Sequence, residues 1–560
     1  MPFFSTRHRR VRTVLSAVVL LATLAACSVT VDGTASRAGA GTTTAGAGNG
    51  SVVTQPSPTA ASSAAATATQ SAPVPAGLES FYHQQLSWGS CQDFSRDDST
   101  KELYAKSTFQ CAYLVVPMDY SKPNGPTMKV GVLKVTATAS NRIGSVVMNP
   151  GGPGASGMSA AAGIADSAKA LLQRFDLVGF DPRGVGASTP TVQCHTDAEW
   201  DADRAQTDRT RTAAEIAEAN ARMEELAKRC VALSSAEGVN GAEFLGKVGT
   251  VDVAKDLDVL RAVLGDSKLT YLGYSYGTSI GTQYAEQFPA NVRAMVLDGA
   301  VDPDADPTEG LLNQASGFQT AFDDFAKWCA QQAGCVLGTD PTKATAVYQA
   351  LTRPLLDKPL SLADGRVLSY DDANTGTFQA LYSEELWAYL LKGLLELSQG
   401  KGSILMALAD FYYGRDASGH YPNLLDAFAA VNCMDKPRVD DATKQRTMEQ
   451  YNKAAPFQDS GDPAAALKNV CDFWPAEPTL GPHVPEVDGL APTLVISTTH
   501  DPATPYQQGV NLAKDLGSTL LTFEGTQHTV YLSSGVSCVD DIGNAYLIDL
   551  KLPAEGTTCS

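Results

Sequence analysis

The sequence predicts an α/β protein whose mostly parallel sheet is covered by helices on both faces and interrupted by a helical insertion. Two observations lead to this fold class. Short apolar runs alternate with amphipathic segments, which is the pattern of parallel strands buried on both faces. The stretch between residues 300 and 493 is instead largely helical in pattern and contains no convincing buried strand.

The individual elements follow from these patterns. Strands are expected at 109–117 and 128–137 as an opening hairpin, and then at 144–149, 175–180, 269–274, 294–300, 493–497 and 519–523. Helices are expected at 251–264 and 506–516 in the sheet domain, at 213–230 in a small insertion over 190–247, and at 317–331, 344–351, 384–397 and 403–412 in the large insertion.

The N-terminal segment is expected to direct export. Arg7, Arg9, Arg10 and Arg12 precede an apolar run that is too short to remain as a spanning helix. The run ends in Leu24-Ala-Ala-Cys27, which resembles the lipobox of bacterial lipoproteins. We therefore expect a signal peptide at 1–26 and lipidation of Cys27, which would anchor the exported protein to the cell membrane. Ordinary secretory cleavage beside a stray cysteine is the alternative.

The rest of the chain divides into a linker and a folded body. Residues 27–77 are dominated by Ser, Thr, Ala, Gly and Pro and cannot bury enough surface to fold. The body is expected to comprise a first core part at 78–305, a helical cap at 306–488 and a C-terminal core part at 489–560. The whole chain has 61 acidic residues and only 42 basic ones, so a nucleic-acid partner is not expected.

The 11 cysteines give an odd number that becomes even once Cys27 is assigned to the anchor. Ten cysteines in an exported protein predict five disulfides. Connectivity is not fixed by the sequence, and we adopt pairing of neighbours: Cys91–Cys111, Cys194–Cys230, Cys329–Cys335, Cys433–Cys471 and Cys538–Cys559. No C-x-x-C pair or H-E-x-x-H motif occurs, so no metal site is expected.

Two glycine-rich motifs suggest different chemistry. The first, Gly152-Pro-Gly154-Ala-Ser-Gly157, satisfies the dinucleotide fingerprint. Pro150 and Pro153 remove amides that a pyrophosphate would use, and two strands precede the motif, so we expect no cofactor.

The second motif is Gly273-Tyr-Ser275-Tyr-Gly277, a G-x-S-x-G sequence. A second match, centred on Ser279, overlaps it. A nucleophile elbow needs a strand before the serine, and only Ser275 has one. Ser279 falls one helical turn later and is expected to be a helix residue.

A serine nucleophile requires a histidine base oriented by a carboxylate, both following it on loops after later strands. Asp501 follows the expected strand at 493–497, and His528 follows the one at 519–523. Ser275, Asp501 and His528 are therefore the predicted catalytic triad. The oxyanion hole is expected to use the N–H of Tyr276 and the N–H of Gly152, with Gly151 as the alternative.

Several blocks resemble the exported tripeptidyl aminopeptidases of actinobacteria. These blocks are Asn149-Pro-Gly-Gly-Pro-Gly154, Asp181-Pro-Arg-Gly-Val-Gly186, Gly273-Tyr-Ser-Tyr-Gly277, Val296-Leu-Asp-Gly299 and Asp501-Pro-Ala-Thr-Pro505. The resemblance implies an α/β-hydrolase serine peptidase related to proline iminopeptidases, whose His-Gly-Gly-Pro-Gly motif has Pro150 here in place of the histidine. Within this family, a protein that is also a lipoprotein resembles the cell-envelope serine proteases of mycobacteria.

The resemblance also implies a substrate. An exopeptidase that removes short N-terminal peptides must bind a free ammonium group, and in the family carboxylates of the cap do so. Candidates here are Glu384, Glu385 and Asp435, near the matching cap motifs that contain Tyr382, Trp387 and Cys433. The first two also fit solvated acids of a first helical turn, and Asp435 also fits a residue that only orders the loop beside Cys433. Tyr382 and Trp387 are expected to belong to the core of the cap. Two other functions remain open. The same triad could serve an esterase or lipase acting on envelope lipids, or it could be the relict of an enzyme in a lipoprotein that only binds its ligand.

Overall fold

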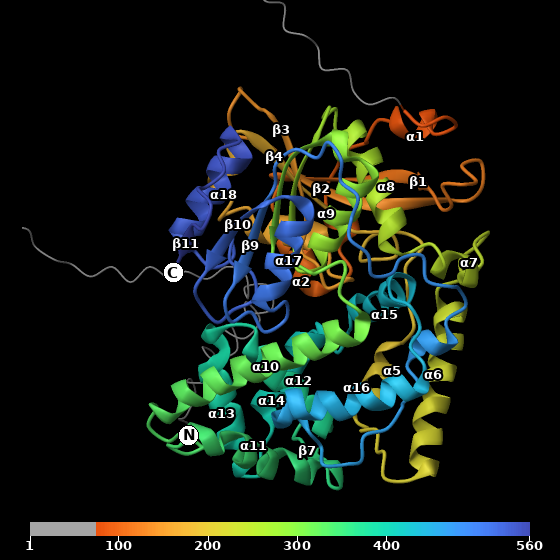
Figure 1. Cartoon of the computed structure of the whole chain (residues 1–560). Coiled ribbons are helices and arrows are strands. Elements are labelled where there is room, and N and C mark those ends of the chain that lie inside the picture. Colours follow the sequence, from red (N-terminus) through yellow and green to blue (C-terminus); the bar gives the residue numbers. More distant parts are fainter. Residues whose placement is uncertain (1–73) are drawn as a thin grey trace, which may run out of the picture.

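The computed structural model describes residues 74–560 (Figure 1). The expected signal peptide at 1–26, Cys27 and most of the expected linker at 27–77 lie outside the described residues. Between residues 74 and 560, no helix is both long and apolar enough to cross a membrane.

One nine-stranded sheet forms the centre of the molecule, in the order β1-β2-β4-β3-β5-β6-β9-β10-β11. The hairpin strands β1 and β2 are antiparallel, as are β2 and β4, and all other neighbours are parallel. Every residue of β3, β4 and β5 is buried, because helices cover both faces. The predicted fold class is thereby confirmed. The strands are β1 Phe109–Pro117, β2 Thr127–Val135, β3 Gly144–Asn149, β4 Phe175–Phe180, β5 Leu269–Tyr274, β6 Val292–Asp298, β9 Leu494–Thr498, β10 Thr519–Phe523 and β11 Thr558–Cys559.

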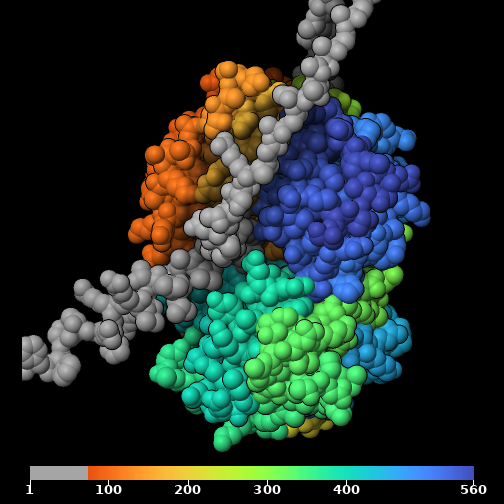
Figure 2. All heavy atoms as spheres, turned by 90° about the vertical axis from the view of Figure 1, so that its left-hand side faces the viewer, coloured from red at the N-terminus to blue at the C-terminus, as the bar shows by residue number. Residues whose placement is uncertain are grey.

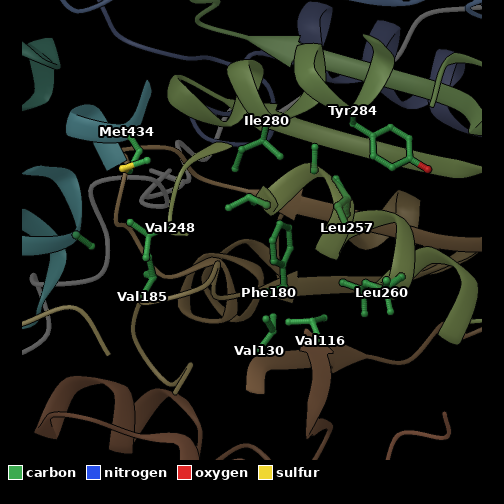
Figure 3. Close-up of a cluster of buried hydrophobic side chains, with 14 of the residues drawn as sticks. Val116, Val130, Phe180, Val185, Val248, Leu257, Leu260, Ile280, Tyr284 and Met434 are labelled. Atoms are coloured by element: carbon green, nitrogen blue, oxygen red, sulfur yellow. The ribbon is translucent and has the colours of Figure 1, made fainter. Parts of the chain in front are cut away.

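Alternate residues of each strand enter two separate cores. Val147 of β3 packs with α8, α9 and α17 in the cluster that Figure 3 shows in part, whereas its neighbours Val146 and Met148 pack with α3, α4 and α18. The helices of the sheet domain are α1 Glu79–Tyr82, α2 Asp98–Leu103, α3 Gly157–Ile164, α4 Lys169–Leu172, α8 Thr250–Val263, α9 Tyr276–Gln287, α17 Tyr506–Leu516 and α18 Ser537–Asp549.

The large insertion forms a cap with its own core, built around aromatic side chains such as Phe318, Phe322 and Trp387. In Figure 2 it is the green and teal lobe beside the orange and blue lobe of the sheet domain. The smaller insertion joins the cap, because the Arg204 guanidinium donates to Asp372 and Asp410. The helices of the two insertions are α5 Asp197–Arg204, α6 Ala213–Leu233, α7 Gly241–Leu245, α10 Pro307–Ala330, α11 Ala344–Thr352, α12 Tyr370–Leu381, α13 Trp387–Ser398, α14 Ser403–Tyr413, α15 Leu424–Asp435 and α16 Asp441–Ala454. The cap also contains a hairpin whose two strands have two residues each, β7 Leu360–Ser361 and β8 Val367–Leu368.

Helix α15 lies within the cap in sequence but packs on the sheet domain. Met434 belongs to the core cluster of Figure 3, and the Asn423 side chain before the helix accepts from Gly186 N. A Cβ on Gly154 would lie 2.2 Å from Leu424 O, so the glycine-rich loop touches the helix backbone. Helix α15 is therefore packed directly against the sheet domain, next to the glycine-rich loop that follows β3.

Five disulfides join the ten described cysteines: Cys91–Cys111, Cys194–Cys230, Cys329–Cys335, Cys433–Cys471 and Cys538–Cys559. This is the pairing of neighbours adopted from the sequence.

Candidate active site

Ser275 occupies the sharp turn between β5 and α9. Its φ of 54° lies in the left-handed region, which a serine adopts only where the surroundings enforce it. A Cβ on Gly273 would lie 2.5 Å from Gly277 O, and one on Gly277 would lie 2.5 Å from Asn149 O. Both flanking glycines are therefore needed for close approach of strand and helix, as a nucleophile elbow requires.

Ser279, the second G-x-S-x-G serine, lies inside α9. No strand precedes it, and its backbone has no strained turn of the kind seen at Ser275. The structure thus distinguishes the two matches as the sequence context predicted.

Asp501 and His528 meet beyond the ends of β9 and β10. His528 Nδ1 lies 2.9 Å from both carboxylate oxygens of Asp501. The carboxylate is buried and also accepts from Ala503 N and Thr504 N, at 2.9 Å each. This arrangement fixes the ring so that Nδ1 carries the proton and Nε2 is left to exchange one with a nucleophile.

The charge of Asp501 controls the protonation of His528. Burial by itself would lower the pKa of the imidazole, but the adjacent carboxylate outweighs burial and raises the pKa above its usual value. A base must be neutral, so activity is lost as pH falls through this raised pKa. We expect the acid-side midpoint of kcat/KM for a short-chain ester to lie above about pH 6.5, the ordinary histidine value. A pH–rate profile with a lower midpoint would contradict the Asp501–His528 pair.

The oxyanion donors can be assigned from backbone hydrogen bonds. Gly151 N–H donates to the Asn149 side-chain oxygen at 2.9 Å and is therefore occupied. Gly152 N–H has no acceptor among the described residues, and Tyr276 N–H, at the first position of α9, has none either. Gly152 and Tyr276 also line the cavity beside Ser275. The geometry favours Gly152 over Gly151 as the second donor.

Gly151 has a different task, which a substitution can test. A Cβ there would lie 2.5 Å from Tyr274 O and 2.9 Å from Tyr276 N, at a φ of 95°. We expect Gly151→Ala to displace the oxyanion loop and lower kcat by about 100-fold or more. Gly163→Ala is the matched control, because a Cβ there meets nothing within 4 Å. Equal kcat values for the two variants would contradict this role.

A cavity of about 630 Å³ opens between the sheet domain and the cap. Ser275, His528 and Asp435 all line it. Glu384 and Glu385 do not: they are exposed on a one-turn 3-10 helix, Glu384–Leu386. The structure therefore does not support these two glutamates as ligands of a substrate ammonium group, because their side chains face solvent as first-turn acids do.

Two residues of the site were not predicted. Thr504 Oγ1 donates to Asp501 Oδ2 at 3.0 Å and lies 3.3 Å from His528 Nδ1. Tyr382, expected to be cap core, packs its ring edge-on against His528 with 5.6 Å between centroids, and its carbonyl accepts from His528 N. The position of Thr504, three residues after Asp501, could have indicated a contact between the two side chains. Nothing in the sequence indicates the contact of Tyr382 with His528.

Comparison with known proteins agrees with this fold. A family model described as "alpha/beta hydrolase fold" matches residues 144–534. The chain is 47% identical over 488 residues to "Serine protease Hip1" of Mycobacterium tuberculosis (strain ATCC 25618 / H37Rv), covering 85% of this chain and 91% of that protein.

Two further relatives carry different names. "Carboxylesterase B" of the same strain is 44% identical over 481 residues, covering 85% of this chain and 90% of that protein. "Tripeptidyl aminopeptidase" of Streptomyces lividans is 30% identical over 478 residues, covering 83% of this chain and 86% of that protein. The fold and the serine protease relative together support a serine peptidase.

Proposed function

The chain belongs to the alpha/beta hydrolase fold family, and on that premise we propose that it is a serine exopeptidase of the cell envelope that releases tripeptides from free N-termini. The observation that carries the proposal is a single carboxylate, that of Asp435, which lines the same cavity as Ser275.

The chemistry follows from the triad. Ser275 Oγ attacks the scissile carbonyl while His528 Nε2 takes its proton, and Asp501 stabilises the imidazolium that forms. Gly152 N–H and Tyr276 N–H donate to the oxyanion. His528 then gives the proton to the leaving amine, which leaves an acyl-enzyme. Water, deprotonated by His528, hydrolyses this ester and frees Ser275.

Asp435 is held rigidly on one side and open on the other. Its Oδ1 accepts from Thr250 N at 2.9 Å and its Oδ2 from Thr250 Oγ1 at 2.5 Å. Because the Thr250 hydroxyl proton is used there, the Tyr276 hydroxyl, 2.5 Å away, donates to Thr250 Oγ1. Thr250 is the sole hydrogen-bond donor to this carboxylate among the described residues. The remaining lone pairs are available to a ligand.

The electrostatics of Asp435 suit an ammonium group. The carboxylate lies at the N-terminus of α8, where the helix dipole favours a negative charge. Burial nevertheless raises the pKa of Asp435 to about 6, so a bound cation would stabilise the ionised form. Because the carboxyl group loses its charge as pH falls through about 6, we expect KM for free-amine substrates to rise on that side.

The position of Asp435 suits a tripeptide. One tyrosine side chain and two hydrogen bonds of 2.5 Å connect the residue after Ser275 to the carboxylate. This path sets an upper limit on the separation, and three extended residues, which span roughly 10 Å, are compatible with it. A substrate whose ammonium group binds Asp435 would then present its third carbonyl to Ser275.

A carboxylesterase acting on envelope lipids is the second candidate, because one relative bears the name carboxylesterase and an ester uses the same triad. Asp302, Asp306 and Asp435 all line the cavity, which argues against a purely apolar lipid groove. The two candidates are separated by kcat/KM for a fluorogenic tripeptide amide and for short- and long-chain esters, with Ser275→Ala as the blank. Activity confined to the esters would reject the peptidase.

The envelope location is part of the same proposal. Five disulfides among the described residues fit an oxidising compartment. Lipidation of Cys27 would attach the enzyme to the membrane through the linker. Loss of membrane association in Cys27→Ala, measured by fractionation, is the expected result.

A further inference from the structure

Asp298 ends β6 at the centre of the active-site edge of the sheet. Its strand lies between β5, which leads to Ser275, and β9, which leads to Asp501. The residue is completely buried, and none of the chemical steps described above uses its carboxylate.

One residue thus contacts both the nucleophile and the loop of the base. The main-chain oxygen of Asp298 accepts from Ser275 N at 2.9 Å. Its carboxylate Oδ2 accepts from Val530 N and Tyr531 N at 2.8 Å each, two and three residues after His528. Val530 and Tyr531 are more than 200 positions away from Asp298 in the chain, so these contacts join separate parts of the sheet domain.

Both segments that Asp298 holds are strained. Ser275 has a φ of 54°, and in the histidine loop Thr529 and Leu532 have φ of 62° and 57°. Non-glycine residues keep such conformations only where several interactions fix them. Val530 and Tyr531 lie between the two strained residues, so the carboxylate fixes the middle of the strained loop.

The second carboxylate oxygen of Asp298 is unpaired among the described residues, and the end of β6 lies close to the triad. Asp298 Oδ1 is buried and has no hydrogen-bond partner among the described residues. A Cβ on the next residue, Gly299, would lie 3.1 Å from His528 Cε1, so the end of β6 touches the imidazole. The other ionisable groups that act on Asp298 are Asp501 and Tyr274. Tyr531 and Asp540 in turn act on Tyr274, and Asp540 accepts from Leu532 N in the histidine loop.

We infer that Asp298 is a positioning residue that holds the nucleophile elbow and the histidine loop together and presents a second negative charge to His528. The inference rests on the triad alone and is independent of whether the substrate is a peptide or an ester. Burial raises the pKa of Asp298 to about 7, and its charge adds to that of Asp501 in raising the pKa of His528.

The decisive variant is Asp298→Asn, because the amide oxygen can still accept from both loop amides while the charge is lost. The rate of phosphonylation of Ser275 by a fluorophosphonate is measured against pH, which requires no knowledge of the substrate. Without the second charge the pKa of His528 falls, so the acid limb should move to lower pH by roughly half a unit or more. An acid limb that does not move overturns the inference.

Two further variants separate this effect from general destabilisation. Asp266→Asn is the matched control: its carboxylate is also largely buried and accepts a backbone amide, Ser145 N at 2.9 Å, but at the opposite end of β3. It should leave the acid limb unmoved, and an equal shift in this variant would also overturn the inference. Asp298→Ala leaves two buried amides unpaired and should lower the plateau rate by about 100-fold or more. If that variant does not fold, Asp298→Asn decides alone.

Discussion

Replacing Ser275 by alanine should lower kcat/KM for every substrate by about 10⁴-fold or more, because the acyl-enzyme can no longer form. The same change at Ser279 should cost less than about tenfold, equivalent to one hydrogen bond. Both serines sit in a G-x-S-x-G sequence, but only Ser275 has the strained backbone of an elbow. Comparing the two variants therefore tests the elbow geometry rather than the motif.

The comparison is made by steady-state kinetics and by labelling with a fluorophosphonate. Ser275→Ala should take up no label, and Ser279→Ala should be labelled at close to the wild-type rate. Label or turnover retained in Ser275→Ala would reject the nucleophile assignment, and with it the roles given to Asp501 and His528.

Replacing Asp435 by asparagine should selectively weaken cleavage of peptides with a free N-terminus. Loss of a desolvated ion pair costs about 2 kcal/mol or more, which corresponds to a loss in kcat/KM of roughly 30-fold or more. An N-acetylated peptide or an ester has no ammonium group and should be affected much less. The measurement is the ratio of kcat/KM values for the free and acetylated peptide.

Two control variants make this ratio interpretable. Thr250→Val removes the hydrogen bond that Oγ1 donates to Asp435 and the one that it accepts from Tyr276, but leaves the carboxyl group of Asp435 in place. Any loss should therefore be equal for the two peptides. Glu384→Gln removes an exposed carboxylate outside the cavity and should change neither rate. A uniform loss across all substrates in Asp435→Asn would assign this residue a structural role only.

The buried strands of the sheet were predictable, whereas parts of the cap were not. Strands such as β3 and β5 are short apolar runs that must be buried on both sides, so composition alone locates them. Helix α12 begins Tyr370-Asp371-Asp372 and includes Gly376, whose hypothetical Cβ lies 2.4 Å from Leu405 O. This glycine is explained by the close packing of α14 against α12, and the sequence does not reveal that contact.

The candidate site divides in the same way. The triad could be predicted because each member follows a recognisable strand, and the order along the chain is that of the fold. Other contacts of the site could not be predicted, because they join residues far apart in the chain. Asp298 and Val530 are 232 positions apart, and Asp435 and Thr250 are 185 positions apart. Glu384 and Glu385 lie outside the cavity lining for a related reason: closeness to Tyr382 in sequence does not determine which side of a turn faces the cavity.

Recognition of a free N-terminus can be tested directly by product analysis. A ten-residue peptide is incubated with the enzyme, free or N-acetylated, and the products are identified by mass spectrometry over time. We expect release of the N-terminal tripeptide from the free peptide, followed by the next three residues, and little cleavage of the acetylated form. Internal cleavage, or equal cleavage of both forms, would contradict it.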